Sequence, residues 1–80
     1  MEDRVAIIAI LVSQKESVST INEILHEYSE YIIGRLGLPY KQKNINIISI
    51  VLDAPQDKVS ALAGKIGKLQ GVTTQTLFSK

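Results

Sequence analysis

Two runs of apolar residues dominate the hydropathy pattern of the chain, and neither alternates regularly with polar residues. The first is continuous from Val5 to Val12, and the second occupies residues 44–53 with Ile45, Ile47, Ile48, Ile50, Val51 and Leu52. Successive side chains of a strand point to opposite faces, so an unbroken apolar run is typical of a strand that is buried on both faces. The pattern therefore predicts two central strands of one sheet.

Residues 14–29 carry apolar side chains at helical spacing. Ser13 and Glu16 stand before this stripe at the spacing of a capping box, in which the two side chains bond free backbone N–H groups at the helix start. We therefore expect a helix from about Gln14 to Ser29. Its buried stripe consists of Val18, Ile21, Ile24, Leu25 and Tyr28.

A second helix is expected to begin near Ala54 and to end at Gly71. Pro55 suits the first helical position, where its missing N–H would have had no partner, and Asp57 complements the positive helix N-terminus. Gly71 suits the position that stops a helix. The buried stripe of this helix consists of Val59, Leu62, Ala63, Ile66 and Leu69.

Two segments of mixed polarity predict edge strands. Alternation through residues 31–38 places Tyr31, Ile33, Arg35 and Gly37 on one face and Ile32, Gly34, Leu36 and Leu38 on the other. A polar connection over residues 39–43 follows. Residues 72–79 also alternate, with threonines among the apolar residues. Glycine and charge are tolerated best at the edge of a sheet.

The predicted element order is βαββαβ, which is typical of the ferredoxin-like α+β plait. Two right-handed split crossovers give an antiparallel sheet of order 4-1-3-2, with both helices on one face. The first and third strands are central in this order, and these are the two strands that the apolar runs predict. Local pattern and topology therefore agree.

One face of such a sheet has no helix to cover it. It would present alternate residues of the first strand, either 5, 7, 9 and 11 or 6, 8, 10 and 12, and both sets are aliphatic. A contiguous apolar patch on a protein surface usually marks an interaction site. We therefore expect a homo-oligomer, a dimer or a tetramer, that is joined through the open face.

Length and composition limit the functional classes. Eighty residues suit one domain over residues 1–80, and a net charge of +1 predicts no attraction to nucleic acid or to a membrane surface. With no cysteine and one histidine, the chain has neither a disulfide framework nor a multi-histidine metal site of its own. No cofactor and no catalytic residue is expected. The apolar run at residues 5–12 is too short to span a membrane, and a cytoplasmic location is expected.

Arg35 is the most distinctive candidate for ligand binding. It lies between Gly34 and Gly37 on a predicted edge strand, and its planar guanidinium suits a carboxylate, a phosphate or an intersubunit ion pair. Lys41 and Lys43 either extend an anion site or keep the loop solvated.

Gly64 and Gly67 form a second candidate group, within the second helix. A glycine inside a helix costs about 1 kcal/mol relative to alanine. We therefore expect these two to allow close approach to the sheet or to a partner, rather than to contact a ligand.

Three other functions find less support in the residues. The lone His26, on the first helix, could act as a base or as one ligand of a metal site between subunits, but we expect it to be a surface or partly buried residue. RNA-binding modules of this topology stack bases on aromatic residues of the central strands, and here those strands carry none. A small phosphatase of this fold would need an arginine and a water-orienting asparagine, for which Arg35 with Asn44 or Asn46 supplies the residue types without a supporting spacing.

Several blocks of the chain resemble the small bacterial family of regulators of the iron-only hydrogenase system. They are residues 22–28, 32–40, 47–51 and 62–68 with Gly71-Val72, and the Gly-Arg-x-Gly-x-Pro-Tyr and Gly-Lys-x-Gly blocks are the most specific. That family is similar to ACT domains and to the ligand-sensing domain of the nickel-responsive repressor. Such domains bind small effectors at subunit interfaces and assemble through sheet contacts. The resemblance implies that Arg35, Gly37, Pro39 and Tyr40 are the positions of interest.

The chain also departs from those relatives. It has Ser13-Gln-Lys-Glu16 where amino-acid-binding ACT domains commonly place a glycine, and it lacks the histidines and cysteine of the nickel sensor. Amino-acid binding in the mode of those ACT domains, and nickel sensing, are therefore disfavoured. We expect a non-enzymatic regulatory domain that binds a small effector or a partner protein at subunit interfaces. The alternatives are a purely structural or protein-interaction module, and then a small enzyme or an RNA-binding module.

Overall fold

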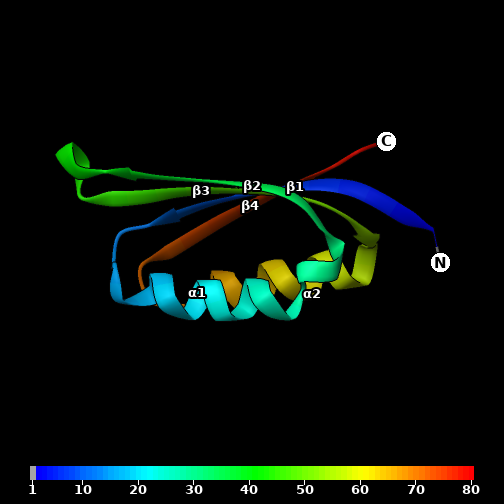
Figure 1. Ribbon diagram of the computed structural model, residues 1–80, viewed down its shortest axis with the longest axis horizontal. Coiled ribbons are helices and arrows are strands. Elements are labelled where there is room, and N and C mark those ends of the chain that lie inside the picture. The colour runs from blue at the N-terminus through cyan, green and yellow to red at the C-terminus, as the bar shows by residue number, and fades with distance from the viewer. Residues whose placement is uncertain (1) are drawn as a thin grey trace.

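The computed structural model describes residues 2–80 and contains the elements in the predicted order (Figure 1). The strands and helices are β1 (Asp3–Val12), α1 (Glu16–Glu27), β2 (Ile32–Tyr40), β3 (Ile45–Pro55), α2 (Gln56–Gly67) and β4 (Val72–Phe78). Two short 3-10 turns, η1 (Ser29–Tyr31) and η2 (Lys41–Lys43), precede β2 and β3.

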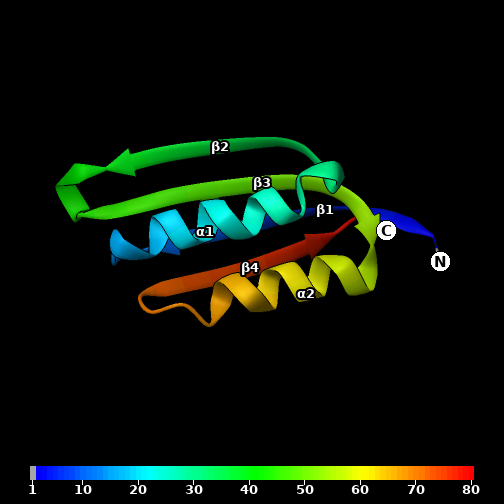
Figure 2. The same ribbon diagram turned by 60° about the horizontal axis from the view of Figure 1, so that its bottom comes forward.

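The four strands form one antiparallel sheet of order β2-β3-β1-β4, which confirms the predicted fold. At its centre, Ala9 of β1 pairs with Ser49 of β3 on one side and with Gln75 of β4 on the other. Both helices lie on the same face of the sheet, with α1 next to β1 and β3 and α2 next to β4 (Figures 1 and 2). Strand β2 extends beyond the part of the sheet that α1 covers (Figure 2).

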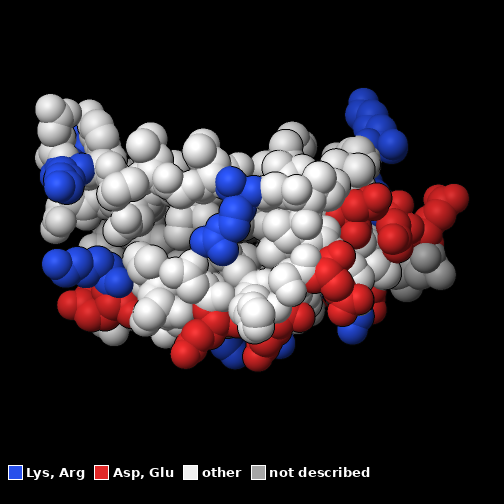
Figure 3. All heavy atoms as spheres, in the orientation of Figure 1, with Lys and Arg blue, Asp and Glu red and all other residues white. Residues whose placement is uncertain are grey.

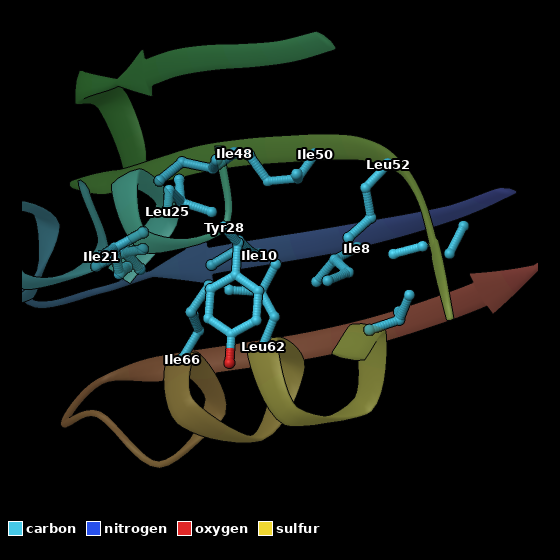
Figure 4. Close-up of a cluster of buried hydrophobic side chains, with 14 residues drawn as sticks. Ile8, Ile10, Ile21, Leu25, Tyr28, Ile48, Ile50, Leu52, Leu62 and Ile66 are labelled. Carbon is cyan, nitrogen blue, oxygen red and sulfur yellow. The ribbon is translucent and has the colours of Figure 1, made fainter. Parts of the chain in front are cut away.

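The core lies between the sheet and the two helices (Figure 4). Alternate residues of the two central strands are buried in it, and the helices contribute the stripes that their spacing predicts. The buried residues are Ala6, Ile8, Ile10, Val12, Ile48, Ile50, Leu52 and Ala54 from the strands, and Ile21, Leu25, Tyr28, Val59, Leu62 and Ile66 from the helices. Neither helix within residues 2–80 has the length and apolarity that a membrane crossing requires.

The predicted capping box at the start of α1 is wrong. The helix begins at Glu16, and Lys15 at its N-cap makes no side-chain capping bond. Ser13 instead faces the turn before β4, where its hydroxyl and its backbone N–H both donate to the Gly71 carbonyl oxygen, at 3.1 and 2.8 Å. The contact with Gly71 therefore occupies the hydroxyl and the backbone N–H of Ser13, which are the groups that a capping box would use.

The second helix also differs at its ends from the prediction. Pro55 is the last residue of β3 and the N-cap of α2, rather than the first helical residue. The helix ends at Gly67, and Gly71 follows in the turn to β4 with a left-handed φ of 74°. Gly71 therefore serves the turn and does not end the helix.

A β-bulge in β2 corrects the predicted division of its faces. Ile32 pairs with Leu52 while Gly34 pairs with Val51, so Ile33 is an extra residue in the strand. The extra residue reverses the alternation. Ile32 therefore shares the helix side with Arg35, rather than the open face with Leu36. The strand also includes Pro39 and Tyr40, which the sequence analysis placed in the connection.

Candidate functional site

The uncovered side of the sheet, which we call the open face, carries the odd-numbered residues of β1. Ala6, Ile8, Ile10 and Val12 are buried against the helices, and the other set points away from them. The pairing of the strands places apolar residues of every strand on this side. The apolar residues that the pairing places on the open face are Val5, Ile7, Ala9, Leu11, Leu36, Leu38, Tyr40, Ile45, Ile47, Val51 and Leu77.

Much of the open face is accessible to solvent. Leu77, Leu36 and Leu38 are 68%, 63% and 51% exposed, and Ile7 at the centre is still 40% exposed. In Figure 3, where the open face forms the upper edge, Lys and Arg atoms appear only near the two ends of that edge. The polar residues that the pairing places in the middle of the face, Ser49, Gln75 and Thr73, are uncharged, and Asp53 lies opposite Val5 near one end. Few charges at the centre are typical of a buried interface.

A shallow furrow lies on the other side of β2, between this strand and α1. It has a volume of about 250 Å³. Residues of β2 and of α1 both line it, and it lies where β2 extends beyond the part of the sheet that α1 covers. The furrow is lined by Val18, Asn22, Arg35, Gly37, Leu38, Pro39, Asn46 and Ile48.

Arg35 lies across the furrow and is held by α1. Its Nη2 donates a hydrogen bond of 2.8 Å to Oδ1 of Asn22. Figure 3 shows basic atoms in the hollow between the sheet above and α1 below. Arg35, Gly37 and Pro39 lie on one side because they occupy alternate positions of the strand, and the bulge before them places Ile32 on the same side.

A larger hollow continues the furrow towards the tip of the β2–β3 hairpin. Its volume is about 600 Å³, and it shares Pro39 and Asn46 with the furrow. The other lining residues come from the β1–α1 connection, the start of α1 and the β2–β3 hairpin around its tip, and they are Ser13, Gln14, Lys15, Glu16, Tyr40, Lys41, Asn44 and Ile45. Together the two hollows hold the cations Arg35, Lys15 and Lys41 and the carboxylate Glu16. The region is therefore electropositive.

The remaining candidate residues are separate from the furrow. Tyr40 lines the larger hollow and donates from its hydroxyl to Oε1 of Gln42 at 2.8 Å. Gly67 lies against β4, where a Cβ would come 3.0 Å from Oγ1 of Thr74, as expected for close approach to the sheet. Gly64 has no such neighbour, because a Cβ there would meet no atom within 4 Å. For Gly64, close approach to a partner is the part of the expectation that stays a prediction.

Asn22 is a polar furrow residue that was not predicted from the sequence, and the apolar lining residues Val18, Leu38 and Ile48 were not predicted as site residues either. Asn22 lies four residues after Val18, so the two share one edge of the helix, beside the buried stripe. That spacing was the available signal. The spacing could identify Asn22 as a site residue only if this edge of the helix were known to face β2, and that follows from the packing of α1, not from the sequence.

The titratable groups elsewhere make structural contacts. Lys65 of α2 lies 5.1 Å from the ring centre of Tyr28 and 3.6 Å from the Glu27 carboxylate. Hydrogen bonding to Tyr28, with smaller contributions from Glu27, raises the pKa of Lys65 above its ordinary value. His26 is exposed. Within residues 2–80 no group of His, Asp and Glu side chains is placed to hold a metal ion.

Comparison with known proteins gives a family and a fold. Residues 4–76 match the family described as "TM1266-like: Iron-only hydrogenase system regulator, putative". The solved structure of the uncharacterized protein TM1266 from Thermotoga maritima is 38% identical, with a TM-score of 0.93 over 99% of this chain and 100% of that one. No match is found among curated proteins.

Two further structures share the fold, and one of them is an ACT domain. The ACT domain from GTP pyrophosphokinase of Chlorobium tepidum is 25% identical, with a TM-score of 0.73 over 94% of this chain and 99% of that one. A formyltetrahydrofolate deformylase from Pseudomonas putida is 16% identical, with a TM-score of 0.63 over 94% of this chain and 28% of the enzyme. The second likeness concerns the fold alone.

Proposed function

The chain belongs to the TM1266-like family, and from this premise we propose that it is a non-enzymatic regulatory domain that acts as a homo-oligomer and binds a small effector. The family description makes regulation of an iron-only hydrogenase system the context of this role. The observation that carries the proposal is the open face, an apolar surface on the helix-free side of the sheet.

The size and character of the open face support an identical partner. Strands about 4.8 Å apart that rise about 3.3 Å per residue give, over roughly eight residues, a four-stranded face of about 500 Å² before side-chain relief is counted. This approaches the area of about 800 Å² per partner in a standard interface. Since the middle of the face carries aliphatic and uncharged polar residues, a two-fold axis through it brings no like charges together.

The furrow is the effector site in this proposal. It lies on the helix side of β2, so face-to-face association leaves it accessible to solvent. The expectation from the sequence was an effector between subunits. The geometry instead favours an effector that is held within one chain, on the same strand that contributes Leu36 and Leu38 to the interface.

Association is tested by placing a charge at the centre of the open face. Ala9 lies in the middle of β1 between Ser49 and Gln75, and Ala61 lies exposed on α2, so Ala9→Lys and Ala61→Lys are the same substitution on opposite sides of the molecule. We expect light scattering at micromolar concentration to give at least twice the chain mass of 8.8 kDa for the unchanged protein and for Ala61→Lys. Ala9→Lys should shift towards the monomer, because a buried lysine has no partner there.

A mass of 8.8 kDa for the unchanged protein at that concentration would refute the oligomer. An unchanged oligomer in Ala9→Lys would show that another surface joins the copies. Circular dichroism on both variants checks that each remains folded, so that loss of association is not mistaken for loss of structure.

A further inference from the structure

We propose that the furrow binds a small organic anion, whose carboxylate or phosphate oxygens are held by the Arg35 guanidinium. This inference rests on the proposed function in taking the furrow as the effector site, and it adds the chemical class of the ligand. Three observations carry it: within residues 2–80 most N–H donors of Arg35 have no partner, the floor of the furrow at Gly37 is open, and the surrounding residues are mainly basic.

The two arginines of the chain differ in how fully they are used. Arg4 donates to Oε1 of Gln56 at 2.9 Å and to the Ser79 carbonyl oxygen at 2.6 Å, and it lies 4.7 Å from the ring centre of Phe78. Among the described residues, the Arg35 side chain has one hydrogen-bond partner, the Asn22 amide oxygen. Across residues 2–80, no carboxylate lies within ion-pair distance of it. A guanidinium has five N–H donors, so most of those on Arg35 remain available to a ligand.

Asn22 prepares the guanidinium for such a ligand. The bond from Nη2 to Oδ1 fixes the long side chain across the furrow, so less rotamer entropy is lost when an anion binds. An amide oxygen does not neutralise the cation, as an aspartate at the same place would. The arrangement therefore orients the positive charge and leaves it uncompensated.

The floor of the furrow has room for a ligand. A Cβ added to Gly37 would meet no atom within 4 Å, so the space above the strand is empty of protein. At about 30 Å³ per water molecule, a volume near 250 Å³ corresponds to roughly eight waters, which suits a small molecule.

The walls determine what kind of anion fits. Val18 and Ile48 offer aliphatic contact, and Asn46 offers an amide at the junction with the larger hollow. Beyond that junction Lys15 and Lys41 outnumber the single carboxylate, Glu16. A short aliphatic body with an anionic head satisfies all these groups, whereas a neutral molecule would leave Arg35 without a charged partner.

The test is a titration of the isotope-labelled protein with succinate, butyrate, glycerol 3-phosphate, inorganic phosphate and the neutral butyramide. Saturable shifts are expected at the Gly37 backbone amide and the Arg35 Nε–H with at least one anion, and none with butyramide. Arg35→Gln should weaken that binding about tenfold or more, as expected for loss of a charged hydrogen-bonding group. Lys58→Gln, on the exposed side of α2, is the control for net charge and should leave it unchanged.

A second variant tests the space rather than the charge. Gly37→Leu keeps Arg35 but fills the furrow, and the open surroundings of Gly37 let the variant fold. It should abolish binding of the carboxylates. Binding to a carboxylate identifies an organic acid as the ligand class, and binding confined to the phosphates identifies a phosphorylated compound.

The inference is overturned by the absence of saturable shifts at Gly37, by equal binding of butyramide, or by Arg35→Gln binding as tightly as the unchanged protein. The mass from light scattering on the same samples shows separately whether the copies associate, so failure of anion binding is not mistaken for failure of the proposed assembly. An oligomer without anion binding overturns the ligand class alone. A monomer that binds the anion supports the ligand class and overturns the interface.

Discussion

Individual glycines in this chain have opposite roles that their sequence context does not distinguish. Gly71 has a φ of 74° and lies against the β1–α1 connection, where an added Cβ would come 2.5 Å from Cγ of Gln14. Gly64 is exposed on α2 and faces open space. The first is therefore required by backbone geometry and packing, and the second is a helix position that alanine would suit better.

This difference predicts stability changes of opposite sign. Gly71→Ala should lower the free energy of unfolding by about 1–2 kcal/mol, because a left-handed backbone and a close contact both oppose the new methyl group. Gly64→Ala should raise it by up to about 1 kcal/mol through helix propensity. Urea denaturation at one fixed protein concentration measures both. Equal effects of the two substitutions would contradict the assigned role of Gly71.

For single residues, the sequence predicted which side chains could bind a ligand better than it predicted which side chains contact one another. Arg35 was identified as an anion-binding candidate because a charge between glycines is unusual on a strand. Asn22 could not be identified in the same way, since its role exists only because α1 places it within 2.8 Å of Arg35. The same limit applies to Ser13, whose capping pattern is overridden by a bond to Gly71.

Among the elements, α1 begins in a way that depends on the distant α2–β4 turn. The Ser13 hydroxyl bonds the Gly71 carbonyl oxygen, and the Ser17 hydroxyl donates to the Gln70 carbonyl oxygen at 2.8 Å. These bonds connect residues more than fifty positions apart. They hold the first turn of α1 against the turn that leads into β4, in place of a local cap.

Removing one of these bonds should destabilise the fold measurably. Ser17→Ala should lower the free energy of unfolding by about 0.5–1.5 kcal/mol, because the Gln70 carbonyl oxygen loses its side-chain donor. Ser19→Ala is the matched control, since Ser19 is exposed on the same helix and makes no side-chain hydrogen bond within residues 2–80. Thermal and urea denaturation should separate the two variants. A Ser17→Ala protein as stable as the Ser19→Ala protein would show that water replaces the bond at no cost.

The elements themselves were predictable because hydrophobic period is a local property. All four strands and both helices follow from it, and so do the central positions of β1 and β3. The bulge at Ile33 was not predictable, because one unpaired residue leaves the alternation on each side intact and changes only their relative phase. That phase determines which residues of β2 reach the furrow.

For the whole molecule, the open face predicts that stability depends on protein concentration. If folded copies associate, mass action favours the folded state, and the melting temperature rises as the protein concentration rises. We expect this rise for the unchanged protein and for Ala61→Lys, and a nearly constant melting temperature for Ala9→Lys. Calorimetry over a hundredfold range of concentration makes the measurement. A constant value in all three proteins would contradict association through this face.

The functional conclusions depend on more than the fold. The sequence correctly predicted the open face and the family, because both depend on features that extend along the whole chain. It predicted only part of the furrow, because that surface combines side chains from α1, β2 and β3 with a strand that the helix fails to cover. Space that is left empty by packing has no signal in a hydropathy pattern.

Strand β2 has a consequence for how any measurement on this protein is interpreted. Its leucines face one side and Arg35 and Gly37 the other, so the two surfaces are separated by the thickness of a single backbone. Thermodynamic linkage requires that coupling between them be reciprocal: the factor by which an anion alters self-association equals the factor by which self-association alters affinity for the anion. If the proposed assembly and the proposed site are coupled, a dissociation constant for an anion is defined only together with the protein concentration at which it was obtained.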